Sequence, residues 1–382
     1  MGATLLIMGA MIGTGMLGMP AAQGNSGLIP GFAMLLFCWL YTLCCSRLLL
    51  EACTWFPKGS SFMSIATELL GKKVAVLFWC VYAILFYCGI TSHIAAAGDA
   101  IGGLFQNYLS NLLSSVFFTL FLGLFAYNSM RATDNLNRLF IFGLSLISFL
   151  FILVSYPYVK VAHLIGTQWT QIFPAIHIFL FAFIFQFIIP SLYSYLECDA
   201  RALKKAIWIG STCTLLLYAV WLSLILGVVP GKELARDFLT GKTTLDSLEA
   251  YINNPFLSGL VHEFVILALS TSFLALSITF FDFWADTLKW TRRGYHGIVL
   301  IFLVLVIPLI LAMNFPQLFV RIVDLGGFIG ATIAFGIFPV LFVWIGRYYK
   351  YRQATPALLP GGKFALILII LASIGALILS PT

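Results

Sequence analysis

The chain has very little charge for its length. Charged residues make up 9% of its 382 residues, whereas soluble domains contain about 25%. Hydrophobic residues make up 61%, and apolar stretches of about 20 residues, the length that crosses a bilayer as a helix, recur from one end to the other. This composition excludes a soluble globular domain and predicts an all-α polytopic membrane protein.

The sequence also lacks the signatures of soluble enzymes. It contains neither a phosphate-binding G-x-x-x-x-G-K-[ST] loop nor a G-x-S-x-G nucleophile elbow. His262 and Glu263 begin a zinc-protease pattern, but Ile266 stands where the second metal-binding histidine is needed. None of the eight cysteines falls in a loop predicted to be external, so neither disulfides nor a metal cluster is indicated. We therefore expect no enzymatic activity, no cofactor and no bound metal.

The net charge is +7, and its distribution predicts how the chain crosses the membrane. Eleven apolar spans separate loops that are alternately rich and poor in Lys and Arg. Sixteen of the 21 basic residues lie in or beside loops on the side of the N-terminus, and the other five are Lys160, Lys232, Arg236, Lys242 and Arg321. Because positive loops stay in the cytoplasm, we predict a multi-pass protein of the bacterial inner membrane with a cytoplasmic N-terminus, and not a nucleic-acid-binding protein.

The spans form a single predicted transmembrane domain, residues 1–382. They are expected at residues about 3–22, 29–50, 74–103, 110–129, 138–156, 173–196, 205–229, 259–285, 297–314, 319–345 and 364–380.

Two of these spans contain residues that weaken a helix. Gly13, Gly15, Gly18 and Pro20 fall within eight residues of the first span, and Pro190 lies in the middle of the sixth. A broken helix survives in hydrocarbon only where its free backbone groups face protein or a ligand. The breaks lie five spans apart, an odd number. They therefore predict two inverted repeats, about 3–156 and 173–345, followed by an extra helix at about 364–380.

Four stretches of the chain resemble the hydroxy/aromatic amino acid permeases, a branch of the amino acid–polyamine–organocation superfamily. They are Met16–Pro20, Ile189–Ser191 with Tyr195 and the charged turn Arg201–Lys205, Thr271–Leu274 with Phe281–Asp286, and Asn137–Phe140. The resemblance implies the LeuT-like five-plus-five inverted-repeat fold. It also implies import of an aromatic amino acid, tyrosine or tryptophan, driven by the proton gradient.

An amino acid substrate needs groups that hold its carboxylate and its ammonium. The N–H groups of Thr14, Gly15 and Met16 would face the carboxylate, because the N-terminus of a half-helix attracts anions. Carbonyls near Gly13 and in the sixth span would accept from the ammonium. In the alternative interpretation the glycines of the first span serve close helix packing.

An aromatic substrate also needs an apolar slot. Phe185 and Phe187 in the sixth span and Tyr87 in the third are candidates for its walls. Gln186 either reads a phenol or indole group or satisfies a freed backbone group. His93 accepts a substrate hydrogen bond, titrates in the working pH range, or is simply hydrogen-bonded inside the bundle.

Candidates for the coupling ion lie in the eighth span. Ser270, Thr271 and Ser272 either complete a cation site with carbonyls of the first span or hydrogen-bond to their own helix. Asp282 takes part in proton transfer or an inner gate, with Arg138 as a candidate partner, or is an interfacial carboxylate paired with a loop arginine. No Lys or Arg lies within residues 139–156, where some proton-driven relatives place a basic residue instead of the cation, so sodium coupling stays open.

The sequence thus favours a secondary transporter that imports an aromatic amino acid together with a proton by alternating access, surrounded by membrane lipid. A carrier for small hydroxy amino acids and a sodium-coupled symporter are alternatives within the same class. A polytopic enzyme acting on a lipid-linked substrate is an alternative from another class, but it needs clustered acids, histidines or metal ligands, which the short loops do not offer.

Overall fold

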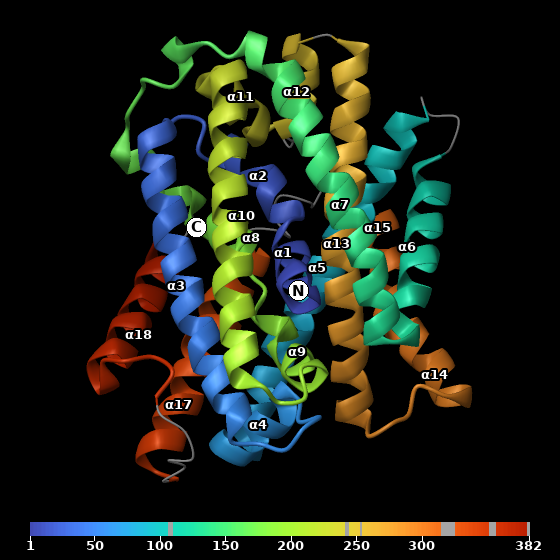
Figure 1. Ribbon diagram of the computed structural model, residues 1–382, viewed down its shortest axis with the longest axis vertical. Coiled ribbons are helices and arrows are strands. Elements are labelled where there is room, and N and C mark those ends of the chain that lie inside the picture. Colours follow the sequence, from blue (N-terminus) through green and yellow to red (C-terminus); the bar gives the residue numbers. More distant parts are fainter. Residues whose placement is uncertain (106–109, 241–243, 253, 315–324, 351–356, 380–382) are drawn as a thin grey trace.

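The computed structural model describes residues 1–105, 110–240, 244–252, 254–314, 325–350 and 357–379, and every regular element in these ranges is helical (Figure 1). Nine helical runs in these ranges are long and apolar enough to cross a membrane. Helices α1 (Gly2–Met11) and α2 (Thr14–Ala22) form a further span bent by 45°, and α18 (Gly362–Ile378) is a shorter apolar helix. Ten of the eleven predicted spans are therefore confirmed as long enough to cross a membrane, and α18 covers most of the eleventh. Residues 319–324 of the tenth predicted span and residue 380 of the eleventh lie outside the described residues.

The remaining helices follow the predicted spans with short helices between them. Two of them, η6 and η8, are π-helical continuations of neighbouring helices. Their bounds are α3 (Leu28–Thr54), α4 (Phe62–Leu70), α5 (Lys72–Leu104), α6 (Asn111–Asn128), α7 (Met130–Ser155), η1 (Tyr156–Tyr158), η2 (Val161–His163), η3 (Trp169–Gln171), η4 (Phe173–Ala175), α8 (Ile176–Ala182), η5 (Gln186–Ile188), α9 (Ile189–Tyr195), α10 (Ala200–Val228), α11 (Gly231–Leu239), α12 (Thr244–Ile252), α13 (Pro255–Leu288), α14 (Gly294–Ile301), η6 (Phe302–Val306), α15 (Ile307–Asn314), η8 (Gly327–Ile337) and α17 (Phe338–Tyr348).

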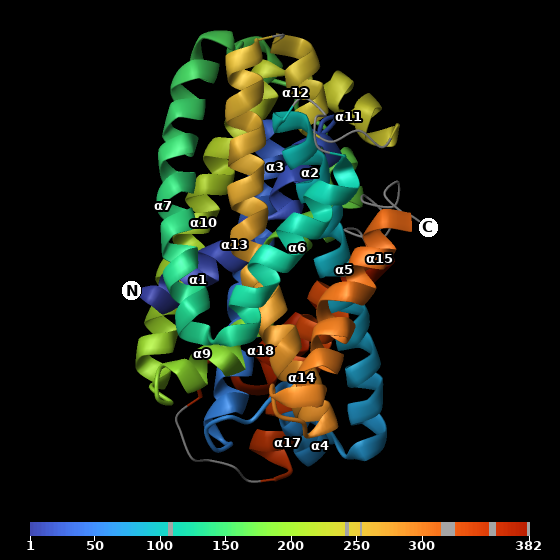
Figure 2. The same cartoon turned by 90° about the vertical axis from the view of Figure 1, so that its right-hand side faces the viewer.

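Burial separates the central helices from those that face lipid. In the most apolar stretch of each span, 89% of the residues are buried in the run from η3 to α9 and 89% in α13, against 28% in the run from α7 to η1 and 33% in the run from α14 to α15. A helix that is apolar on all sides lies either in a core or against lipid. The α8–α9 run and α13 therefore form the core with the broken α1–α2 pair, which Figures 1 and 2 show between the longer helices.

Short helices mark the two ends of the bundle. In Figure 1, α11 and α12 lie at the upper end, and α4 and α9 lie at the lower end. A Cβ atom added to Gly24, just after α2, would lie 2.3 Å from the carbonyl oxygen of Gly231 at the start of α11. The chain after α2 and the start of α11 are thus in direct backbone contact, so α11 covers this end of the broken span.

A buried ion pair fastens α3 to α17. Oε1 of Glu51 lies 2.6 Å from Nε of Arg347, and Oε2 lies 2.6 Å from Nη2 of the same guanidinium. The two side chains are only 2% and 13% exposed. The backbone N–H of Leu358, on the way to α18, donates to the same carboxylate at 2.8 Å. This two-pronged geometry is the strong form of an Arg–carboxylate contact.

We expect Arg347→Met to lower the free energy of unfolding by about 3–5 kcal/mol, because it leaves the buried Glu51 carboxylate without its cation. Thermal unfolding of the purified protein in detergent measures the loss. Lys58→Met is the matched control, since Lys58 pairs with Glu197 where the two side chains are 51% and 78% exposed and such pairs stabilise little. Equal melting temperatures for the two variants would contradict the assignment.

Candidate functional site

The first span breaks at Ile12 and Gly13. Helix α1 ends at Met11, and α2 begins at Thr14. We expected the break to extend from Gly13 to Pro20, but Pro20 lies inside α2, which corrects that boundary.

A neighbouring helix explains why α2 tolerates this proline. Because Pro20 has no N–H, the carbonyl of Met16, four residues earlier, loses its helical donor. Nε1 of Trp221 on α10 donates to that carbonyl at 3.1 Å instead. The helix therefore continues past the proline with its freed acceptor satisfied.

The sixth span breaks between α8 and η5, at residues 183–185. We expected a kink caused by Pro190, but Pro190 lies in the first turn of α9, where a helix needs no N–H donor. The break therefore precedes the proline. Gln186 serves the unwound backbone: its Oε1 accepts from the N–H of Phe185 at 2.9 Å, and its Nε2 lies 3.4 Å from the carbonyl of Thr42.

One hydroxyl joins the two breaks. The hydroxyl oxygen of Tyr218 lies 2.6 Å from the carbonyl of Met11, at the end of α1, and 2.9 Å from the carbonyl of Ala182, at the end of α8. Tyr218 is fully buried on α10, and a buried tyrosine hydroxyl needs a partner. Tyr218 was not among the residues predicted from the sequence, where its only signal is a tyrosine in the middle of an apolar span.

A small cavity lies between the breaks. Its volume is about 20 Å³, room for about one water molecule. Five predicted site residues, Gly13, Thr14, Gly15, His93 and Phe187, line it together. The rest of the lining is Ala10, Met11, Leu85, Gly89, Phe181, Ile184 and Leu276.

Four predicted site residues do not line the cavity: Met16, Tyr87, Phe185 and Gln186. The hydroxyl of Tyr87 donates to the carbonyl of Leu303 at 3.2 Å, away from the breaks. Phe185 is fully buried beside the amide of Gln186, and the carbonyl of Met16 is occupied by the indole of Trp221. None of these side chains contributes to the described lining of the cavity.

The start of α2 supplies the donors that a carboxylate needs. The N–H groups of Thr14 and Gly15 lie in its first turn, where no intrahelical acceptor is available, whereas the N–H of Met16 donates to the carbonyl of Gly13 at 3.1 Å. A Cβ atom added to Gly15 would lie 2.6 Å from Cα of Ala182. Glycine is therefore required for the two broken spans to touch.

His93 and Ser272 form a buried polar pair against the first break. Nε2 of His93 lies 2.6 Å from Oγ of Ser272, and its Nδ1 lies 2.7 Å from the carbonyl of Gly89. Because a carbonyl only accepts, Nδ1 carries the proton, and a neutral ring then accepts from the serine through Nε2. A Cβ atom on Gly13 would lie 2.8 Å from Nε2, so the pair faces the opening in the backbone.

The hydroxyls of the eighth span mostly bond to their own helix. Ser270 Oγ donates to the carbonyl of Ile266 at 2.6 Å, and Thr271 Oγ1 donates to that of Ala268 at 2.8 Å. Thr271 Oγ1 also lies 3.5 Å from the carbonyl of Ile12 at the first break. Thr271 thus connects the eighth span to the break.

Asn137 on α7, which begins one of the four stretches that resemble the permeases but was not predicted as a site residue, lies close to this contact. A Cβ atom on Gly9 would lie 2.4 Å from Oδ1 of Asn137 and 3.1 Å from Cβ of Thr271. The amide is fully buried, and neither of its polar atoms has a partner within the described ranges.

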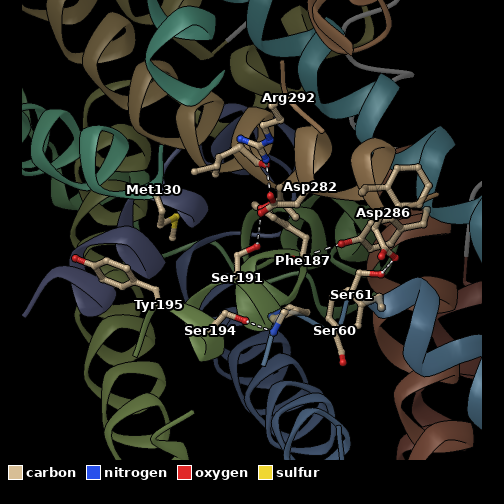
Figure 3. Close-up of a pocket in the computed structure, with 17 residues that line it drawn as sticks. Ser60, Ser61, Met130, Phe187, Ser191, Ser194, Tyr195, Asp282, Asp286 and Arg292 are labelled. Carbon is tan, nitrogen blue, oxygen red and sulfur yellow. Dashed lines mark hydrogen bonds and ion pairs between the residues drawn. The ribbon is translucent and has the colours of Figure 1, made fainter. Parts of the chain in front are cut away.

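A second cavity, here called the vestibule, opens at the end of the bundle that carries α4 and α9. Its volume is about 380 Å³. In Figure 3, Asp282 contacts Arg292 and Ser191, and Asp286 contacts Ser61. We considered Arg138 as the partner of Asp282, but Arg138 pairs with Asp134 at 2.5 Å, one turn away on the same helix. Asp282 instead has a loop arginine, as in the alternative interpretation.

Comparison with a solved structure defines the architecture. The fold matches the structure of Mhp1, a nucleobase-cation-symport-1 family transporter, in a closed conformation with bromovinylhydantoin bound, with a TM-score of 0.67 and 13% identity over 99% of this chain and 90% of that one. The protein is therefore a multi-pass membrane protein with the LeuT-like five-plus-five inverted-repeat fold, as the sequence predicts.

The chain belongs to the tryptophan/tyrosine permease family, which it matches over residues 1–380. It is 30% identical to the tryptophan-specific transport protein of Haemophilus influenzae over 98% of this chain and 96% of that one. It is 29% identical to the tyrosine-specific transport system 1 of the same organism, over 99% and 95%, and 26% identical to glutamine transporter 2 of Aliivibrio fischeri, over 82% and 88%. These matches confirm the family resemblance and the expectation that the chain is a permease and not an enzyme.

We expect Gly15→Ala to abolish transport while membrane insertion stays intact, because the added methyl group would collide with the backbone of Ala182. Gly18→Ala is the matched control: its Cβ would lie 3.2 Å from Cγ2 of Ile178, a side chain that shifts easily. Uptake into membrane vesicles compares the two variants. Wild-type uptake by Gly15→Ala would contradict the placement of the site.

We expect Tyr218→Phe to lower both stability, by about 1–3 kcal/mol, and transport, because the carbonyls at the two breaks lose their shared donor. Tyr41→Phe is the control for stability alone, since the Tyr41 hydroxyl lies 2.7 Å from Oγ of Ser373 in the contact between α3 and α18. Melting temperature and initial uptake rate are measured for both. If Tyr218→Phe transports as fast as Tyr41→Phe, the hydroxyl does not organise the site.

Proposed function

We propose that the protein imports an aromatic amino acid, tryptophan, tyrosine or both, across the bacterial inner membrane by proton symport with alternating access. The observation that carries this proposal is the cavity between the two breaks, which Thr14 and Gly15 in the first turn of α2 line together with Ile184 of the sixth-span break. Donors at a half-helix N-terminus suit the substrate carboxylate. The names of the two Haemophilus influenzae relatives support the substrate class.

The lining of the cavity supports an aromatic substrate over a polar one. Most of the side chains around it are apolar, including Phe181, Ile184 and Phe187, with His93 and Thr14 as its polar side chains. A glutamine amide or a serine or threonine hydroxyl buried among them would lose hydrogen bonds to water without the apolar contacts that an indole or phenol ring makes in return. This argues against glutamine, the substrate in the name of the Aliivibrio fischeri relative, and against serine and threonine.

The size of the cavity implies motion during transport. A volume of about 20 Å³ holds no indole or phenol, so the helices around the breaks must separate when substrate binds. Phe187 lines both this cavity and the vestibule. We therefore assign the vestibule to the release route.

Charge supports an orientation in which the vestibule faces the cytoplasm. Lys58, just before α4, and Lys289, just after α13, lie in loops at the vestibule end, and Arg347 lies in the last turn of α17 at the same end (Figure 1). Positive residues beside the spans stay inside. The N-terminus is then cytoplasmic, and α11 and α12 cover the outer side. We also propose that residues about 3–156 and 173–345 form the inverted repeats of a single domain and that α18 is an addition to them.

The proposed coupling ion is the proton, with His93 as a candidate carrier because it contacts Ser272 at the first break. Sodium is the second candidate, favoured by the position of Thr271 Oγ1, 3.5 Å from the carbonyl of Ile12. Ser270 and Asp282 are less favoured, since one bonds to its own helix and the other pairs with Arg292.

Uptake of labelled tryptophan and tyrosine into proteoliposomes tests the proposal, with pH and sodium gradients imposed separately. We expect accumulation with the pH gradient and competition by unlabelled tryptophan or tyrosine but not by glutamine or serine. Empty liposomes and Gly15→Leu are the controls. Accumulation that requires the sodium gradient would make sodium the coupling ion in place of the proton. No accumulation of either amino acid under either gradient would overturn the proposed function.

A further inference from the structure

The vestibule has an aromatic wall. Its volume of about 380 Å³ lies within the range of about 300–1,000 Å³ that is typical of small-molecule sites. Phe62, Tyr82, Phe187 and Phe283 line its inner side. The ring centroid of Tyr82 lies 5.7 Å from that of Phe62 and 5.2 Å from that of Phe283. These packed rings form a continuous surface on which another planar ring can stack or make edge-to-face contacts.

The vestibule also carries one negative charge without a cation. Three ionisable side chains lie in its lining, those of Asp282, Asp286 and Arg292. Arg292 neutralises Asp282 and also lies 3.2 Å from the carbonyl of Ile278. Asp286 accepts hydrogen bonds from Ser61 and Ser64, and no basic nitrogen in the described part of the chain lies within 4.0 Å of its carboxylate. The lining therefore attracts a cation and disfavours an anion.

The aromatic wall and the carboxylate of Asp286 lie next to each other. Phe283 and Asp286 are three residues apart on α13, so they lie on the same side of that helix. Ser61 and Phe62 are consecutive at the start of α4, which places a hydroxyl partner of Asp286 beside the wall. Figure 3 shows Ser61 and Asp286 facing one another across from the Asp282–Arg292 pair. An ammonium group at Asp286 leaves an attached ring within reach of the aromatic wall.

We propose that the vestibule is a second binding site for the transported aromatic amino acid, separate from the cavity between the breaks. Asp286 binds the ammonium, the aromatic wall holds the ring, and the carboxylate points toward the open mouth of the vestibule. The two sites bind opposite ends of the zwitterion: the first supplies N–H donors for its carboxylate, and the second supplies a carboxylate for its ammonium. This assignment rests on the proposed function, which makes an aromatic amino acid the molecule that leaves past Phe187.

Tryptamine tests the vestibule directly, because it keeps the ring and the ammonium of tryptophan but lacks the carboxylate that the first site needs. Its binding to the purified full-length protein in lipid nanodiscs is measured by calorimetry. We expect Asp286→Asn to weaken binding at least about tenfold, since a charge-assisted hydrogen bond is lost. Glu197→Gln, which removes an exposed negative charge outside the lining, leaves binding unchanged. Butylamine, which has no ring, binds more weakly than tryptamine.

Further variants separate this proposal from the proposed function. Asp286→Glu keeps the charge and retains tryptamine binding, which guards against loss of binding through misfolding. Gly15→Leu loses tryptophan uptake but keeps tryptamine binding. Absence of both tryptophan and tyrosine uptake by the wild type overturns the proposed function, whatever the result with tryptamine. Absent tryptamine binding in the wild type, equal binding by Asp286→Asn, or loss of binding in Gly15→Leu overturns the vestibule site.

Discussion

The structure depends on one constraint: backbone groups freed in the middle of a membrane span must find partners. Each group left unpaired in hydrocarbon costs several kcal/mol. Three side chains meet this demand. Tyr218 contacts the terminal carbonyls of both half-helices, Trp221 donates to the carbonyl orphaned by Pro20, and Gln186 binds the unwound backbone of the sixth span. The first turn of α2, whose N–H groups have no intrahelical acceptor, lines the cavity.

The same interactions fix how the two breaks relate to each other. Gly15 lies against the backbone of Ala182, and the hydroxyl of Tyr218 bridges the two chain segments. The broken spans therefore form one joined unit. Under the proposed function, the helices packed around that unit, including α5 with His93, have to give way when a substrate binds, because a cavity of about 20 Å³ holds no indole or phenol.

Two cavities of different character follow each other along the release route proposed for the substrate. The inner one is small and offers N–H donors, and the vestibule is large, aromatic and negatively charged. Phe187 lies between them, and its backbone carbonyl accepts from the hydroxyl of Tyr82 at 3.3 Å. The position of Phe187 is therefore set by the sixth-span break on one side and by the aromatic wall on the other, which couples the break to the vestibule.

The sequence by itself determined the membrane class, the helical spans and the location of the two weakened spans, because hydropathy and the effects of glycine and proline act locally along the chain. It also indicated the family, and it selected Gly13, Gly15 and His93, which meet at one cavity. Only the tertiary structure decided that Tyr218 joins the breaks and that Asp282 pairs with a loop arginine. Tyr218 meets Met11 and Ala182 from a helix distant in sequence, whereas Arg292 lies ten residues after Asp282 in the next loop. Both contacts depend on how helices rotate and pack and on how the chain turns after α13, which an almost uniformly apolar pattern does not encode.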